Sequence, residues 1–178
     1  MRIISGKHKG RRLKAPKSLP VRPTTDMAKE GLMNILAHQY DFEDSTILDL
    51  FSGTGNMSFE FFSRGIKACT AVDANHKCIR YISDTSKTLN FDLNIIKMDV
   101  FKFLTKSKDS YDIIFADPPY NFEKELLEKI YELVFENQLL SEKGVLIIEH
   151  AAQNELDTLE FFQKKRKYGS SVFSFFAN

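Results

Sequence analysis

The chain of 178 residues has little cysteine and no long apolar run. Its only two cysteines, Cys69 and Cys78, do not form a Cys-x-x-Cys pair, and its four histidines show no metal-ligand spacing beside them. We therefore expect neither a structural disulfide nor a bound metal. No hydrophobic stretch approaches the roughly 20 residues of a membrane helix, and the first residues are polar and basic, unlike a signal peptide. These absences predict a cytoplasmic protein.

Internal repeats are also absent, and the apolar segments alternate between strand-like and helix-like patterns. With 43% hydrophobic residues, the chain can bury the core of one domain. A helix that Thr24, Thr25 or Asp26 can cap should end near Tyr40. Strands are expected at 47–51, 68–73, 94–98, 111–116 and 144–149 with helices between them, and a closing pair at 163–168 and 171–176. This order predicts an α/β protein with a doubly wound, mostly parallel sheet.

The N-terminal segment differs from the rest of the chain in charge. Residues 1–25 contain eight Lys or Arg and no acid, residues 161–178 contain four more and no acid, and the 135 residues between them carry 13 basic and 24 acidic side chains. Basic ends on a chain of net charge +1 suggest contact with a polyanion, although a solvated arm that only improves solubility is the alternative. The candidate contacts are Arg2, Lys7, Lys9, Arg11, Arg12, Lys14 and Arg22.

The same segment is expected to form a small extension. Residues 2–15 read as two short strands around Gly6 and Gly10, which predicts a β-hairpin. We therefore divide the chain into a basic arm, 1–23, and a main domain, 24–178.

A glycine turn follows the first predicted strand. In LDLFSGTGNMSFE, residues 48–60, Gly53 and Gly55 stand between an apolar strand and a helix, where the backbone can approach a nucleotide-like cofactor. A tight connection without a ligand is the alternative. Asp73 ends the second strand, 18 positions after Gly55, where an acid typically accepts hydrogen bonds from ribose hydroxyls.

The residues around this turn favour S-adenosylmethionine over a dinucleotide. A dinucleotide site prefers a third glycine, and Ser58 occupies that position. S-adenosylmethionine has a sulfonium and no phosphate, so it suits a site rich in acids. Asp49, Asp73 and Asp99 come at or near the ends of the first three strands. Each alone could be a surface acid at the start of a helix.

The fourth predicted strand runs into Asp117-Pro118-Pro119-Tyr120. Two prolines end the strand, because each lacks an N–H and has a fixed φ. The Asp117 carboxylate and a backbone carbonyl near Pro118 could accept hydrogen bonds from a planar exocyclic amine and favour its pyramidal, nucleophilic form, while Tyr120 stacks on the base. A stiff turn with a half-buried tyrosine is the alternative. The motif predicts methyl transfer to an amine.

These motifs together resemble the RsmD family, bacterial enzymes that methylate the N2 amine of one guanine in 16S ribosomal RNA. The resemblance extends over nearly the whole chain. It rests on MRIISGKHKGRRLKAP at the start, RPTTDMAKEGLMNIL at 22–36, LDLFSGTG at 48–55, SRG at 63–65, DPPY at 117–120, IEH at 148–150 and KYG at 167–169. The basic start with RPTTD narrows the choice, because the middle motifs occur in many amino-methyltransferases.

The resemblance implies a Rossmann-like class I methyltransferase fold with seven strands, the last antiparallel. It implies that Gly53, Gly55, Asp73 and Asp99 line the S-adenosylmethionine pocket. It also implies that Thr24 and Thr25 lie near the methionine end of the cofactor, that Asp117, Pro118 and Tyr120 hold the guanine, and that the hairpin binds RNA. The expected partner is 16S rRNA in a small ribosomal subunit or assembly intermediate, because a base must leave its stack to react. No membrane contact is expected, and the chain should be a monomer.

The chain departs from the family pattern at Met27-Ala28, Gly31 and Ser170-Ser171, which we expect to touch a helix and a sheet edge rather than the pocket. Three other functions stay open. A DNA methyltransferase acting on adenine N6 or cytosine N4 would use the same Asp-Pro-Pro-Tyr chemistry. A non-catalytic RNA-binding protein could retain the scaffold, and a small-molecule methyltransferase is disfavoured by the basic arm.

Overall fold

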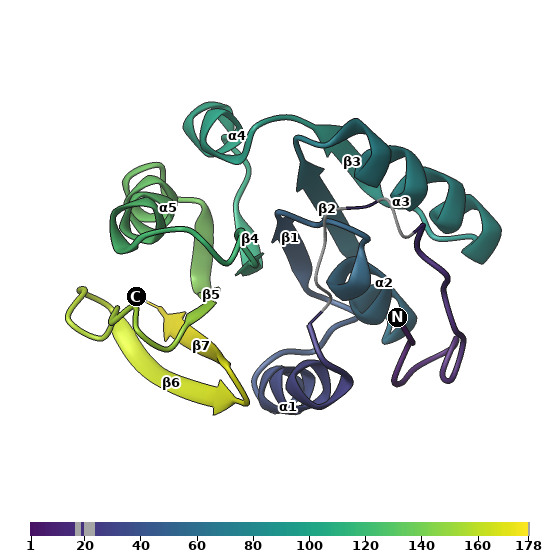
Figure 1. The fold of residues 1–178 in the computed structure, drawn as a ribbon, viewed down its shortest axis with the longest axis horizontal. Helices are drawn as coiled ribbons and strands as arrows, with labels where there is room; N and C mark the ends of the chain where they lie inside the picture. Colours follow the sequence, from purple (N-terminus) through teal and green to yellow (C-terminus); the bar gives the residue numbers. More distant parts are fainter. Residues whose placement is uncertain (17–18, 20–23, 178) are drawn as a thin grey trace.

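The computed structural model describes residues 1–16, 19 and 24–177, and within them an α/β architecture around one sheet (Figure 1). The helices are α1 (Asp26–Ala37), α2 (Asn56–Ser63), α3 (His76–Leu89), α4 (Val100–Lys106) and α5 (Lys124–Glu136). The strands are β1 (Thr46–Leu50), β2 (Ala68–Asp73), β3 (Asn94–Lys97), β4 (Tyr111–Ala116), β5 (Leu140–Ala151), β6 (Phe162–Tyr168) and β7 (Ser171–Phe176). None of the described helices combines the length and apolar character needed to cross a membrane.

The sheet has the topology that the sequence predicts. Its strand order is β3-β2-β1-β4-β5-β7-β6, with β1 to β5 parallel and β7 antiparallel to both of its neighbours. The prediction of seven strands with the last one antiparallel is confirmed. Strands β2 and β4 have the predicted bounds, whereas β5 starts earlier because Leu140 already pairs with Tyr111 at the start of β4.

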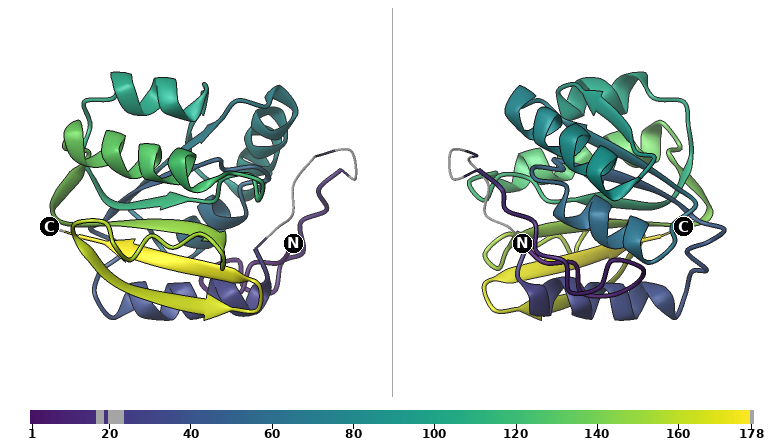
Figure 2. Two further views of the ribbon diagram at one scale, coloured as in Figure 1. Left: turned by 60° about the vertical axis from the view of Figure 1, so that its left-hand side comes forward. Right: turned by 90° about the vertical axis from the view of Figure 1, so that its right-hand side faces the viewer.

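Helices cover both faces of the sheet, which explains why its central strands are buried along most of their length. Side chains alternate between two cores along β1: Leu48 and Leu50 pack with α4 and α5, and Ile47 packs with α1 and α2. Helix α3 packs beside α2 through Ile82 and Phe59 (Figure 2). Strands buried on both faces are typical of parallel sheets, whose carboxyl ends meet at one edge.

Three of the helices that start at that edge, α1, α3 and α4, have side-chain caps. Thr25 Oγ1 accepts a hydrogen bond from Ala28 N, Asn75 caps α3, and Asp99 caps α4. Such caps satisfy N–H groups that have no partner inside the helix.

The arm forms a smaller hairpin than the sequence suggests. Arg2 and Arg12 make one antiparallel bridge, and Ile3 exchanges backbone hydrogen bonds with Gly10 and Arg11 at 2.9 and 3.0 Å. Two extended strands do not form in the described arm, because Ile4 and Ser5 donate their N–H groups to the Glu60 carboxylate instead of to the opposite strand. The arm thereby lies against α1 and α2 (Figure 2).

Close backbone contact at the end of α2 holds the turn of the arm. Lys7 N donates to the Ser63 carbonyl at 2.7 Å, and His8 N donates to Ser63 Oγ at 2.9 Å. Gly6 adopts a φ of +81°, and a Cβ built there would lie 1.8 Å from the Ser63 carbonyl oxygen. Only glycine permits this approach.

We predict that Gly6→Ala releases the arm. Gly10 provides a matched control, because its φ is +80° but a Cβ there would meet nothing within 4 Å. Both variants share the left-handed backbone cost of about 1–2 kcal/mol, and only Gly6→Ala adds the clash. Limited trypsin digestion should cleave at Lys7 and Lys9 at least about tenfold faster in Gly6→Ala than in Gly10→Ala, while the main domain resists. Equal cleavage rates would contradict the docked arm.

Candidate active site

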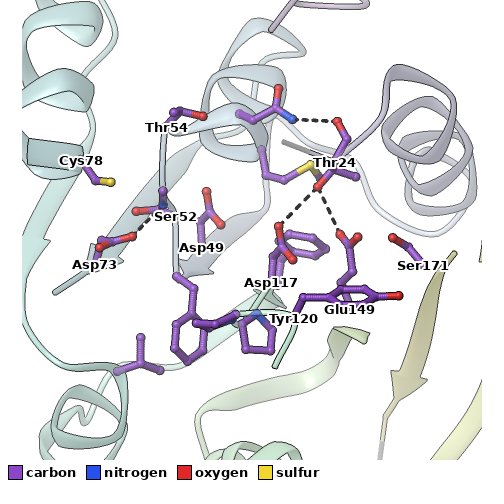
Figure 3. A pocket seen from close by; sticks show the side chains of 18 of the residues that line it. Thr24, Asp49, Ser52, Thr54, Asp73, Cys78, Asp117, Tyr120, Glu149 and Ser171 are labelled. Atoms are coloured by element: carbon purple, nitrogen blue, oxygen red, sulfur yellow. Dashed lines mark hydrogen bonds between the residues drawn. The ribbon is translucent and has the colours of Figure 1, made fainter. Parts of the chain in front are cut away.

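A cavity of about 700 Å³ lies at the carboxyl edge of the sheet, between the ends of β1, β2, β4 and β5 (Figure 3). The structure gathers there nearly all of the residues singled out in the main domain. The predicted site residues that line it are Thr24, Thr25, Asp49, Gly53, Asp73, Asp99, Asp117, Pro118 and Tyr120. One cavity therefore joins the glycine turn to the Asp-Pro-Pro-Tyr motif.

The two glycines of the turn have different roles, one in the cavity lining and one in packing. Gly53 has a φ of +54°, lines the cavity, and donates its N–H to Asp73 Oδ2 at 2.8 Å, while Asn75 N donates to the other oxygen at 2.7 Å. Gly55 is not among the described residues that line the cavity. It has a φ of +71°, and a Cβ there would lie 2.9 Å from the ring of Phe59, so glycine is needed for packing.

Asp49 is a buried acid under the turn. Its Oδ2 accepts hydrogen bonds from the Ser58 backbone N–H at 3.0 Å and from the Ser58 hydroxyl. Burial, opposed by these bonds and assisted by the nearby Asp73 carboxylate, raises the pKa of Asp49 to about 7. Ser58 thus serves as a donor to an acid in the position where a dinucleotide site has its third glycine.

Asp99 and Thr25 also line the cavity, but each has a capping hydrogen bond. Asp99 is exposed, and its Oδ1 accepts from Lys102 N at 3.0 Å. The Thr25 hydroxyl oxygen accepts from Ala28 N at 3.2 Å. The caps therefore hold both side chains at the N-terminal ends of α4 and α1.

The opposite side of the cavity holds two acids around one hydroxyl (Figure 3). Thr24 Oγ1 donates to Glu149 Oε2 at 3.1 Å and approaches Asp117 Oδ2 at 3.5 Å. Burial, with the neighbouring Glu149 and Asp49 carboxylates, raises the pKa of Asp117 well above its usual range. Sequence reasoning missed Glu149, although an acid near the end of a fifth parallel strand obeys the rule that pointed to Asp49 and Asp73.

The two prolines leave one carbonyl available. Pro119 O accepts from Phe122 N at 2.8 Å, whereas no hydrogen bond within the described residues reaches the Pro118 carbonyl. Tyr120 is 52% exposed, and its hydroxyl donates to Ser170 O at 3.4 Å. The tyrosine ring therefore lies on the rim, supported by the turn between β6 and β7.

The lining is strongly acidic. Among the described lining residues, five are acids and none is Lys, Arg or His: Asp49, Asp73, Asp99, Asp117 and Glu149. A phosphate would be repelled here, whereas a ligand with positive charge and hydroxyl groups would be attracted. This charge pattern disfavours a dinucleotide.

The departures from the family pattern lie closer to the site than expected. Met27, Ser170 and Ser171 line the cavity, so the expectation that they avoid the pocket is wrong for these three. Met27 is 72% exposed and lies in the first turn of α1, Ser170 lies in the turn that Tyr120 contacts, and Ser171 begins β7. Gly31 is not among the described residues that line the cavity, but a Cβ there would collide with the ring of Tyr168, which does line it.

The basic residues of the arm lie on the surface. Arg2, Lys7, Lys9, Arg11, Arg12 and Lys14 are all exposed, and Arg22 lies outside the described residues. Arg2 differs from the others because its guanidinium forms an ion pair with Asp26 at 3.0 Å. The other five have no ion pair within the described residues.

Comparisons with known proteins agree with this arrangement. A family model described as "Conserved hypothetical protein 95" matches residues 1–177. YlbH of Bacillus subtilis is 37% identical over 161 residues, covering 88% of this chain and 85% of that protein. Ribosomal RNA small subunit methyltransferase D of Escherichia coli strain K12 is 31% identical over 160 residues, covering 89% and 79%. The solved structure of yhhF from Escherichia coli has a TM-score of 0.86 at 27% identity, covering 99% of this chain and 96% of that one.

The family match spans almost every residue, including the basic arm, the glycine turn and the Asp-Pro-Pro-Tyr motif. The chain belongs to the family described as Conserved hypothetical protein 95, and the resemblance to the RsmD family that its motifs indicate is confirmed.

Proposed function

We propose that this protein transfers a methyl group from S-adenosylmethionine to the exocyclic N2 amine of a guanine in 16S ribosomal RNA. The observation that carries the proposal is that one cavity contains both the glycine turn with Asp73 and the Asp117-Pro118 segment that could accept hydrogen bonds from an amine. The name of the Escherichia coli relative, a ribosomal RNA small subunit methyltransferase, supports the choice of substrate. The assignment of the N2 position rests on the resemblance to the RsmD family.

The cavity suits S-adenosylmethionine by its chemistry. The cofactor would supply a methyl group on a positively charged sulfur. Asp73, oriented by the N–H groups of Gly53 and Asn75, can accept from the ribose hydroxyls. Ionised Asp49 would attract the positive charge of the sulfonium, and the acidic lining favours a ligand whose net charge is positive. Thr24 and Thr25 are proposed for the methionine end.

On the acceptor side, Asp117 and the Pro118 carbonyl would accept hydrogen bonds from the two N–H groups of the guanine amine. This draws the nitrogen lone pair out of conjugation and aims it at the methyl carbon, and Tyr120 would support the base by stacking. As the C–N bond forms and the C–S bond breaks, the amine becomes cationic and releases a proton. The raised pKa of Asp117 makes it a suitable acceptor for that proton.

The arm, residues 1–23, would bind rRNA phosphates beside the main domain, 24–178. Five exposed arm cations without ion pairs in the described structure support this role. A guanine must be unstacked to enter the cavity, which favours a small-subunit particle that already presents the base. We further propose a cytoplasmic monomer.

The decisive experiment offers labelled S-adenosylmethionine with small-subunit particles, naked 16S rRNA and DNA. Particles from cells lacking the protein should accept label fastest, and the label should map to one guanine N2. Labelled DNA would favour the adenine N6 or cytosine N4 alternative. Failure to bind the cofactor would favour the non-catalytic RNA-binding alternative.

Replacing Asp117 should separate chemistry from cofactor binding. We predict that Asp117→Asn lowers the methyl-transfer rate by about 10²–10³, because the asparagine NH₂ cannot accept from the amine. The Kd for S-adenosylmethionine should stay within about twofold. Asp109→Asn, an exposed acid just before β4, is the matched control and should leave both values unchanged. A large loss of cofactor affinity in Asp117→Asn would contradict its assignment to the acceptor.

Cofactor binding should depend on pH through Asp49. Its pKa is about 7 in the free protein, and a bound cation favours the ionised form and lowers that pKa. Binding below pH 7 therefore requires loss of a proton, so affinity should rise with pH and level off above about 7. Calorimetric titration in two buffers of different ionisation enthalpy should detect the released proton. In Asp49→Asn the release should disappear, and an unchanged release would contradict the assignment.

The arm should govern the salt dependence of RNA binding. We predict that Lys9→Ala, Arg11→Ala and Arg12→Ala together flatten the plot of log K against log salt concentration, by about 0.7–0.9 for each lost phosphate contact. Cofactor affinity should not change. Lys102, Lys106 and Lys108 form a control triple, exposed on or near α4 and thus on the opposite face of the sheet. An equal flattening in the control triple would contradict specific binding by the arm.

A further inference from the structure

A continuous chain of hydrogen bonds connects the basic arm to the acceptor acids. It begins at the buried Glu60 carboxylate of α2, which accepts from Ile4 N at 2.7 Å and from Ser5 N at 3.1 Å. Lys29 of α1 lies next to that carboxylate, with 3.4 Å between Nζ and Oε2. Both side chains are almost completely buried, at 0% and 1% exposure. The arm is therefore docked on a buried ion pair.

Lys29 contacts Asn56, a residue of the cavity lining, as well as the arm. Its ammonium donates to the Arg2 carbonyl at 2.6 Å and to Asn56 Oδ1 at 2.9 Å, in addition to its pairing with Glu60. An ammonium has three N–H donors, and here each has its own acceptor: one on the arm, one at the start of α2 and one in the middle of α2. Lys29 thus fixes the arm and the first residue of α2 relative to each other.

Asn56 links Lys29 to the acceptor site through two hydrogen bonds. With its oxygen held by Lys29, its Nδ2 donates to the Thr24 carbonyl at 3.3 Å. The Thr24 hydroxyl in turn donates to Glu149 and approaches Asp117. Figure 3 shows Thr24 above the Asp117 and Glu149 side chains, with the contacts drawn as dashed lines.

We propose that Lys29 is a positioning residue, which couples docking of the RNA-binding arm to the placement of Thr24 and thereby of the Asp117 and Glu149 carboxylates. The inference rests on the proposed function. A disordered or displaced arm would withdraw the Arg2 carbonyl from Lys29, loosen Asn56, and release the Thr24 hydroxyl from the two acids. RNA that holds the arm in place would favour the aligned state.

A purely structural ion pair would predict something different. Loss of Lys29 would then lower the stability of the fold without changing the chemistry of Asp117. Arg64 offers the matched comparison, because its Nε also binds Glu60, at 2.8 Å, but it has no hydrogen bond to Asn56 within the described residues. Arg64→Met removes one cation from the same buried carboxylate and leaves the connection to Thr24 intact.

The first readout is the titration of the Asp117 carboxyl group, followed by ¹³C NMR in the protein without RNA or cofactor. The charged groups that face Asp117 are Glu149 on β5 and Asp49 on β1, and the Thr24 hydroxyl opposes their effect. Thr24→Val should therefore raise the pKa of Asp117. Lys29→Met should raise it in the same direction, and Arg64→Met should leave it unchanged.

The second readout is a double-mutant cycle on methyl transfer. Thr24→Val and Lys29→Met should each lower kcat by about tenfold, and Lys29→Met, which does not alter a residue of the cavity lining, should leave the Kd for S-adenosylmethionine within about twofold. If Lys29 acts through Thr24, the double variant should be no slower than Thr24→Val alone. Because Lys29→Met leaves the Glu60 charge buried, Lys29→Met combined with Glu60→Gln is measured too, and it should behave like Lys29→Met.

The outcomes separate this inference from the proposed function. A raised Asp117 pKa in Lys29→Met, together with non-additive kcat losses, supports the positioning role. An Asp117 titration that moves in Thr24→Val but not in Lys29→Met overturns it, as do kcat losses that multiply. If the wild-type protein methylates no RNA, the proposed function fails, and the NMR titration still decides whether Lys29 acts on Asp117.

Discussion

The common edge of the parallel strands forces five carboxylates into one cavity, and much of the site follows from that constraint. Burial, assisted by the neighbouring carboxylates, opposes ionisation and raises the pKa values of Asp49 and Asp117 above their usual range. Hydrogen-bond donors offset the cost of burying these carboxylates. Ser58 donates to Asp49, two backbone N–H groups donate to Asp73, and Thr24 donates to Glu149. The acids are therefore oriented before any ligand enters.

The opposite charge is kept outside the cavity. Lys29 and Arg64 are directed to Glu60, and Arg2 to Asp26, so these cations are bound to acids of α1 and α2 rather than to those of the site. Under the proposed function, this separation would preserve the attraction of the cavity for a cation while the exposed arm attracts a polyanion. The proposed cofactor and RNA would thus bind at neighbouring sites of opposite charge.

Much of the fold follows from the sequence, because apolar alternation and helix caps are local signals. Asn75 and Asp99 cap the expected helices, and β2 and β4 have their expected bounds. The buried ion pair of Lys29 and Glu60 has no such signal, since a lysine and a glutamate on amphipathic helices normally face water. The docked arm contributes to covering them through a contact between residues about 55 positions apart in the chain.

The acidic lining also affects how strongly the cofactor is bound before and after methyl transfer. Under the proposed function, the acids attract a cofactor whose sulfur is positively charged and meet a neutral thioether after methyl transfer. Asp49 then loses the charge that favoured its ionised form, and its pKa returns toward 7 as it regains a proton. The same carboxylates that strengthen binding of the methyl donor would therefore bind the spent cofactor less strongly, which favours its exchange for a new donor.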